Sequence, residues 1–260
     1  MKYSLLTVVT ACALITAACA DTVVLRQNFD NTTIFPTNTG LGNNNHGDGT
    51  TEGGTWIAES TSGDPTPVTS QYYSATQSLR MSLGATGNAG LVGTRTNDSI
   101  LTGTFELTME VYEETADATW WVTTAETLKR VNLAMGIASS GGVFKVLNNG
   151  LVVSANVSTV SVPLNQWVGI KISGDLDTQI WSAYVDTGSG WTLIDSRSFD
   201  KTKVIDTATN TGINTIFFRP TVRNPTGKVY IDNVLLTVPE PATLGLLGMG
   251  GLLALLKRKK

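Results

Sequence analysis

The chain has 260 residues and a formal net charge of −3 at pH 7, with 18 basic and 21 acidic side chains. This acidic balance disfavours nucleic acid and anionic lipid as partners, because both require a basic surface. The only cysteines, Cys12 and Cys19, lie near the N-terminus, which excludes a disulfide framework or a cysteine metal site from the rest of the chain.

The first twenty residues have the pattern of a secretory signal peptide. Lys2 supplies the positive charge, residues 5–17 form an apolar stretch, and Ala18-Cys19-Ala20 is a small-residue cleavage site. We therefore expect export through the Sec machinery and removal of these twenty residues. Acylation of Cys19 as a lipoprotein is the alternative, although Thr16 stands where a lipobox prefers leucine.

Residues 21–237 are expected to form one domain made almost entirely of strands. Apolar and polar residues alternate through 104–112, which indicates a half-buried antiparallel strand. Asn149-Gly150, between two apolar runs, is the strongest hairpin signal. A short helical turn is expected at 124–130 and long surface loops at 38–54 and 60–70. Further strands are expected at 22–29, 78–83, 131–138, 143–147, 151–155, 168–172, 181–185, 191–199, 213–218 and 229–237.

About a dozen short strands predict an all-β fold, a two-sheet antiparallel jelly-roll sandwich. The meander formed by 167–172, 181–186 and 191–194 resembles the central sheet of concanavalin A-like (laminin-G-like) jelly rolls. The segment 230–234 is similar to the last strand of bacterial jelly-roll modules, including carbohydrate-binding ones. Because this fold hosts lectins, enzymes and adhesive domains, the resemblance leaves the activity open.

Adjacent aromatic pairs are the candidate ligand-binding residues. Trp120-Trp121 and Tyr72-Tyr73 would each present one ring outward if they lie on strands, and a flat exposed ring suits the face of a sugar. Trp167 and Trp181 are expected in the core instead.

The jelly-roll resemblance also implies a structural Ca²⁺ where the first and last strands meet. Asp30 follows the first strand and Asp232 lies in the last, and both offer the hard oxygen ligands that Ca²⁺ prefers. The alternative is that both aspartates accept hydrogen bonds from the backbone.

No residue pattern indicates catalysis. His46, the only histidine, lies in a glycine-rich segment, and no nucleophile elbow is present. The glutamates Glu106, Glu110, Glu113 and Glu114 lack the Glu-x-Asp-x-x-Glu spacing of the laminarinase-type enzymes that this fold resembles. We therefore expect no enzyme, and polysaccharide degradation ranks third among the functions considered.

The C-terminal segment, 238–260, joins a rigid motif to an apolar stretch and a basic stop. The uncharged residues 242–256 are expected to form a helix of about 22 Å, which is short of a hydrocarbon core of about 30 Å. Basic residues stay on the cytoplasmic side, which places the domain outside and predicts transient insertion in the inner membrane. The motif is Val238, Pro239, Glu240 and Pro241, and the stop is Lys257, Arg258, Lys259 and Lys260.

This segment resembles the PEP-CTERM sorting signal of Gram-negative-type bacteria. The resemblance implies processing by an exosortase-type enzyme, a position in the envelope, on the outer surface or in the extracellular matrix, and an association with exopolysaccharide and biofilm. A plain membrane anchor is the alternative. We therefore expect an exported structural or adhesive protein that contacts extracellular polysaccharide, with a dedicated lectin as the second interpretation.

Overall fold

The computed structural model describes the strands of the central domain and the turns beside them. None of the described residues is helical, so none forms a helix that could cross a membrane. The expected signal peptide and the residues after Pro239 lie outside the described part, as does the predicted C-terminal helix. The described residues are 22–30, 35, 45–47, 55–60, 66–74, 76–82, 89–94, 100, 102–114, 120–125, 135–140, 142–148, 152–199, 213, 215–220 and 228–239.

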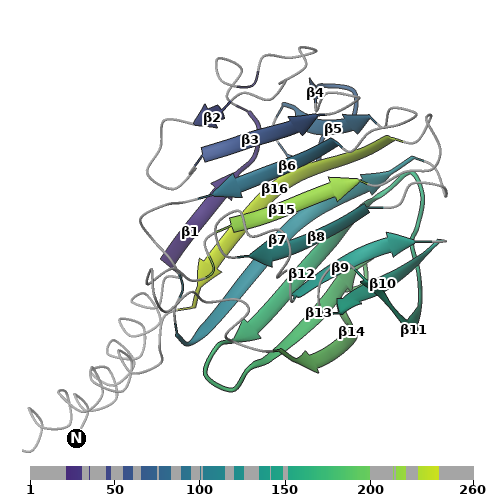
Figure 1. Ribbon diagram of the computed structural model, residues 1–260. Helices are drawn as coiled ribbons and strands as arrows, with labels where there is room; N and C mark the ends of the chain where they lie inside the picture. The colour runs from purple at the N-terminus through teal and green to yellow at the C-terminus, as the bar shows by residue number, and fades with distance from the viewer. Residues whose placement is uncertain are drawn as a thin grey trace, which may run out of the picture.

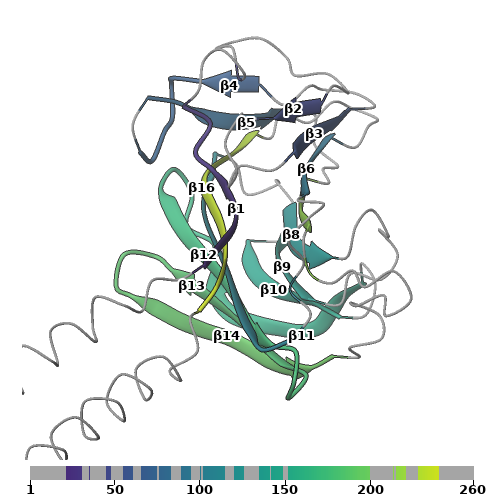
Figure 2. The ribbon, with the colours of Figure 1, turned by 90° about the vertical axis from the view of Figure 1, so that its left-hand side faces the viewer.

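Two antiparallel sheets face each other as layers (Figures 1 and 2). Sheet A has the order β14-β13-β12-β7-β16-β5-β4, and β1 also pairs with β16. Its strands are β1 (Thr22–Gln27), β4 (Thr66–Val68), β5 (Ser78–Ser82), β7 (Thr104–Glu113), β12 (Trp167–Asp175), β13 (Ile180–Asp186), β14 (Trp191–Ser198) and β16 (Lys228–Val238).

Sheet B has the order β11-β10-β9-β8-β15-β6-β3-β2. Figure 2 shows β8, β9 and β10 in the layer opposite β12, β13 and β16. The strands of sheet B are β2 (Asn45–Gly47), β3 (Thr55–Ser60), β6 (Ala89–Thr94), β8 (Trp120–Ala125), β9 (Met135–Ser140), β10 (Val143–Asn148), β11 (Val152–Ser161) and β15 (Thr215–Pro220).

The core lies between the sheets and follows the period-two pattern of the sequence. In β7, Phe105, Leu107, Met109 and Val111 are all at most 2% exposed, while the residues between them are less buried. This places Glu106, Thr108 and Glu110 on the outer face of sheet A, whereas Glu113 at the end of the strand is buried. The all-β, antiparallel prediction is confirmed, and so is the burial of Trp181.

The sequence underestimated the number of strands. Five strands, β2, β3, β4, β6 and β8, were not predicted as such, and β2 and β4 lie within the segments expected to be loops. The helical turn expected at 124–130 is wrong at Thr124 and Ala125, which belong to β8. Sequences such as TPV in β4 and AGLVGT in β6 carry a weak local signal, and pairing with neighbouring strands makes them extended.

Candidate ligand-binding face

A single row of residues crosses five neighbouring strands on the outer face of sheet A. Trp191 of β14 pairs with Asp186 of β13, which pairs with Gly169 of β12. Gly169 in turn pairs with Glu110 of β7, and Glu110 pairs with Asp232 of β16. Because opposite residues of antiparallel strands project to the same face, these residues form one line, here named the acidic row.

A glycine in the middle of the acidic row lets a tryptophan ring reach across it. A Cβ atom on Gly169 would lie only 3.0 Å from Cη2 of Trp191 and 3.3 Å from Cβ of Asp186. The ring therefore lies directly over the glycine backbone and extends from the edge of the sheet toward β7. Trp191 remains 44% exposed, so part of its ring is accessible to a ligand.

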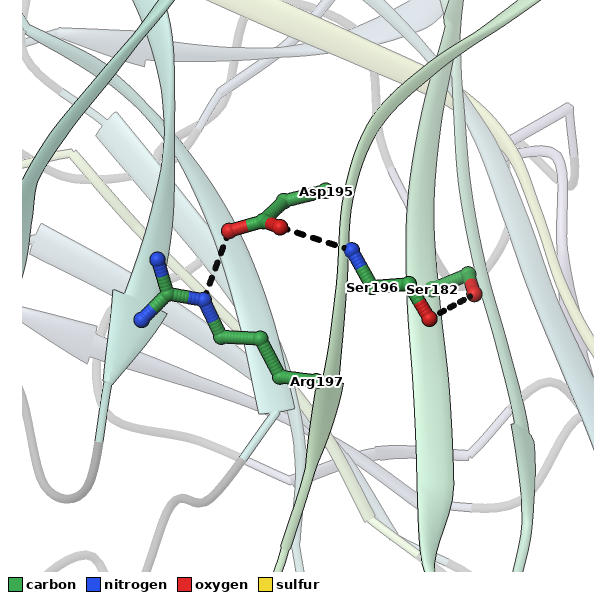
Figure 3. Close-up of polar contacts among 4 residues, drawn as sticks. All are labelled: Ser182, Asp195, Ser196 and Arg197. Atoms are coloured by element: carbon green, nitrogen blue, oxygen red, sulfur yellow. Dashed lines mark hydrogen bonds and ion pairs between the residues drawn. The ribbon is translucent and has the colours of Figure 1, made fainter.

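Side-chain hydrogen bonds fix the edge strand that carries Trp191 (Figure 3). Ser182 Oγ of β13 donates to Ser196 Oγ of β14 at 3.0 Å. Within β14, Arg197 Nε donates to Asp195 Oδ2 at 2.6 Å, and the backbone N–H of Ser196 donates to Asp195 Oδ1 at 2.8 Å. The Ser182–Ser196 bond joins the two strands through side chains as well as through the backbone, and the other two contacts order side chains within β14.

A groove of about 400 Å³ lies beside the acidic row. Its size is within the range of sites that hold small ligands. The groove spans strands that are far apart in the sequence, from β1 through β16 and β7 to the ring from β14. Its polar and aromatic lining includes Arg26, Asn28, Thr108, Glu110, Trp191 and Asn233.

Gln27 lines the same groove and has an unused donor. Its side chain is buried, with 3% of the residue exposed, and its Oε1 accepts the backbone N–H of Phe29 at 2.8 Å. Its Nε2 has no hydrogen-bond partner among the described residues. A buried amide without a partner is costly, so a ligand acceptor that reached this atom would gain a favourable hydrogen bond.

Asp232 anchors the loop that borders the face. Its Oδ2 accepts the backbone N–H groups of Tyr73 at 3.0 Å and Ser74 at 3.1 Å, and its Oδ1 accepts that of Asn233 at 2.8 Å. Asn233 has a positive φ of 48° at a break in the β16–β7 register, and its Oδ1 accepts Ser74 Oγ at 2.7 Å. The irregular backbone of β16 thus provides the anchor for Tyr73.

The structure brings Asp30 and Asp232 to the same loop. Asp30 Oδ1 accepts the backbone N–H groups of Thr76 at 3.0 Å and Gln77 at 3.3 Å. The carboxylate oxygens of Asp30 and Asp232, which would be the ligands of a Ca²⁺, therefore already accept backbone N–H groups. The described part of the chain contains no cluster of three or more acidic, histidine or cysteine residues suited to a metal. This geometry fits backbone anchoring better than coordination, and the calcium site stays a prediction.

Burial and like charge make Glu110 a weak acid. The pKa of its carboxyl is raised to about 7, first by burial and then by the negative charges of Asp186 and Asp232. Burial also raises the pKa of Asp232 to about 6, although its three backbone N–H partners act in the opposite direction. Tyr73 lies at the Asp232 end of the acidic row, since its backbone N–H donates to Asp232 Oδ2. The Glu110 charge is the main reason that the pKa of the Tyr73 hydroxyl is raised.

These raised values predict that the folded state loses stability as the pH rises. Between the ordinary pKa of a glutamate and about 7, folded Glu110 holds a proton that the unfolded chain has released. Ionising this partly exposed group should lower the free energy of unfolding by about 1–2 kcal/mol between pH 5 and pH 8. Urea unfolding at both pH values should show this loss, and Glu110→Gln should make it smaller. An unchanged loss in Glu110→Gln would contradict the assignment.

Aromatic side chains form a second line beside the acidic row. Trp167 lies opposite Tyr112, which lies opposite Tyr230, and neighbouring ring centroids are 5.5 and 5.6 Å apart. Tyr73 adds an edge contact to Trp167 at 5.9 Å. The expectation that Trp167 is a core residue is wrong: it is half-buried on the outer face, because its strand position shares the phase of Gly169 and Lys171.

The predicted aromatic pairs lie on different parts of the fold. Tyr72 and Tyr73 belong to the loop between β4 and β5 instead of a strand, and both are about half exposed, at 48% and 53%. Trp120 and Trp121 begin β8 in sheet B, and their side chains lie outside the described part of the structure. The two pairs are therefore not brought together in one face by sheet A.

The sequence did not predict that Glu110, Asp186 and Trp191 lie together in one site. The alternation of β7 correctly placed Glu110 on the outer face, but it gave no reason to distinguish this glutamate from Glu106. The signal that could have found the site is the strand register, since only the pairing through Gly169 aligns the three residues.

Residues 237–260 match the PEP-CTERM protein-sorting motif. The class of protein follows from this match: the chain carries an exosortase sorting signal, which indicates export and anchoring at the surface of a Gram-negative-type bacterium. The match covers only the C-terminal segment and says nothing about the activity of the domain before it. No curated protein sequence matches the chain.

Solved structures resemble the domain in fold alone. A sialidase chain is 10% identical with a TM-score of 0.52; the match covers 84% of this chain and 19% of that one, so this chain spans about a fifth of the sialidase. Lectin II from Ulex europaeus is 9% identical with a TM-score of 0.48, covering 70% of this chain and 92% of the lectin. The exoplasmic/lumenal domain of VIP36 in a Ca²⁺- and Man2-bound form is 9% identical with a TM-score of 0.49, covering 75% of this chain and 85% of that domain. The two facing antiparallel sheets, with the likeness to the sialidase in fold, confirm the prediction of a jelly-roll sandwich.

Proposed function

We propose that this exported protein serves as a structural or adhesive component of the cell surface or extracellular matrix, and that it contacts polysaccharide through the outer face of sheet A. The observation that carries the proposal is the groove between the open ring of Trp191 and the polar side chains of Glu110, Asn28 and Asn233. Carbohydrate sites combine a flat aromatic face with carboxylate and amide groups that bind hydroxyls. The sorting signal at residues 237–260 supports the location.

Replacing Trp191 with alanine should weaken polysaccharide binding by about thirtyfold, because a tryptophan at the centre of a binding site commonly contributes about 2 kcal/mol. A glycan array would identify the ligand, and isothermal titration of the full-length chain in mild detergent would measure the loss. Ile180→Ala is the matched control, because Ile180 is a similarly exposed apolar residue, at 50%, and does not line the groove. Equal binding by both variants would place the contact elsewhere.

A dedicated lectin is the second candidate. The unused Nε2 of Gln27 beside the groove favours it, because such a donor suits one defined acceptor better than a general adhesive contact. Saturable binding of a single glycan class would support the lectin, whereas weak binding to many polysaccharides would support the adhesive role.

Hydrolysis is the third candidate, and the Glu110–Asp232 pair is the observation that favours it. Glu110 and Asp232 are directly opposite each other on neighbouring strands, so their Cβ atoms are about 5 Å apart, and a retaining glycosidase also uses two acidic side chains at close range. Asp232 fits such a role poorly, because it is fully buried and held by three backbone N–H groups. An assay for reducing ends after incubation with polysaccharides tests this directly, and release that Glu110→Gln abolishes would replace the adhesive proposal.

A further inference from the structure

Glu110 differs from the other carboxylates of the acidic row in having no hydrogen-bond or ion-pair partner among the described residues. Asp186 Oδ1 accepts the backbone N–H groups of Gly188 at 2.8 Å and Gly190 at 2.9 Å, and Asp232 is occupied by its loop. No hydrogen bond or ion pair with a described residue engages the Glu110 carboxylate. Burial and the two neighbouring carboxylates, Asp186 and Asp232, all raise its pKa.

The same face already binds one ammonium group. Lys171 Nζ lies 4.9 Å from the centroid of the Tyr184 ring and 4.7 Å from that of Trp191, and it is 3.7 Å from Glu106 Oε2. The lysine is therefore held by two aromatic rings and one carboxylate. Trp191 lines the groove beside Glu110, so the same ring also borders a carboxylate that forms no ion pair with a described residue. Arg26, at the β1 side, is the cationic residue among those that line the groove.

We infer that the groove selects polysaccharides that carry ammonium groups, such as glucosamine units whose nitrogen is not acetylated. This inference rests on the proposed function, because it assigns a ligand class to the same groove. A ligand ammonium against Trp191 and Glu110 reproduces the arrangement around Lys171 and offsets the partly buried charge of Glu110. An acetamido group in the same place leaves that charge unpaired, so the site discriminates against the acetylated polymer.

The test compares glycans that differ only at nitrogen. Isothermal titration of the full-length chain in mild detergent at pH 8 would use β-linked glucosamine oligomers in N-trimethylated and N-acetylated forms of equal length, with a glucose oligomer as the nitrogen-free probe. The trimethylated form keeps its charge at every pH, and Glu110 is largely ionised at pH 8 because its pKa is about 7. We expect the trimethylated oligomer to bind about tenfold more tightly than the acetylated one.

Glu110→Gln removes the charge with little change of shape and should reduce this preference to about one. Asp177→Asn is the matched control: Asp177 lies in the turn between β12 and β13, its Oδ2 accepts the backbone N–H of Gly103 at 3.0 Å, and it does not line the groove. This variant removes the same charge from the chain but should retain the full tenfold preference. Thermal unfolding would verify that both variants are folded.

Each outcome separates the inference from the proposed function. Equal binding of the trimethylated and acetylated oligomers by the unmodified chain would overturn the inference and leave polysaccharide binding standing. A preference that survives Glu110→Gln, or that Asp177→Asn also removes, would overturn it as well, because a general attraction to an acidic protein would then explain the result. No binding of any oligomer or polysaccharide would contradict the proposed function itself.

Discussion

Replacing Asp232 with alanine should lower the free energy of unfolding by about 3 kcal/mol. The carboxylate accepts three backbone N–H groups, two of them from Tyr73 and Ser74, which are 159 and 158 residues away in the sequence. Asp232 is fully buried, so its removal leaves donors without an acceptor where little water can reach them. Chemical unfolding at pH 7 measures the loss, and hydrogen exchange at the amides of Tyr73 and Ser74 should increase more than elsewhere.

Asp30→Ala is the informative comparison for Asp232→Ala. Asp30 also accepts backbone N–H groups of the same loop, but its bonds to Thr76 lie at an exposed site, where water can replace the lost acceptor. We expect a loss of about 1 kcal/mol. Measuring both variants with Ca²⁺ and with a chelator also tests the calcium prediction. If Ca²⁺ raises the stability of the unmodified chain but not that of either variant, the result would favour a metal site over the hydrogen-bonded arrangement.

Deleting Pro239–Lys260 should move most of the protein from the cell surface into the periplasm or the medium. The deletion leaves β16 complete, since this strand ends at Val238, and Val238 pairs with Thr22 of β1. The folded domain should therefore persist without the segment that carries the sorting signal. Cell fractionation with immunoblotting measures the distribution, and unchanged surface retention would refute a sorting role for this segment.

A second variant distinguishes a sorting signal from a plain membrane anchor. Replacing Pro239, Glu240 and Pro241 with alanine leaves the apolar stretch and the basic cluster unchanged. An exosortase that reads the motif should no longer process this variant, which should accumulate uncleaved in the inner membrane. A plain anchor depends only on the apolar stretch and its basic stop, so in that case the distribution would match that of the unmodified chain.

Strand positions were predictable from the sequence where one face is buried and the other is polar. In β7, β12 and β13 the alternation is regular, and the predicted and observed strands agree closely. The prediction failed where strands are short or weakly apolar, as in β2 and β4, because pairing with β3 and β5 stabilises these segments. It also failed at Trp167, because a tryptophan in a sandwich is usually assigned to the core. The alternation of β12 instead places this side chain on the outer face of sheet A, with Gly169 and Lys171.

The sequence by itself determined the class of fold and revealed the sorting signal of the protein. Period-two alternation is a local property of the backbone, and the terminal sorting signal is a linear pattern, so both can be read without coordinates. Only the tertiary structure decided which residues meet on the outer face of sheet A. Four strands contribute the residues Trp191, Gly169, Glu110 and Asp232, and the pairing register of these strands aligns them. A shift of one residue in that register would move the side chains of a strand to the other face of the sheet. The pairing energy of whole strands sets that register, so no local pattern reveals the groove.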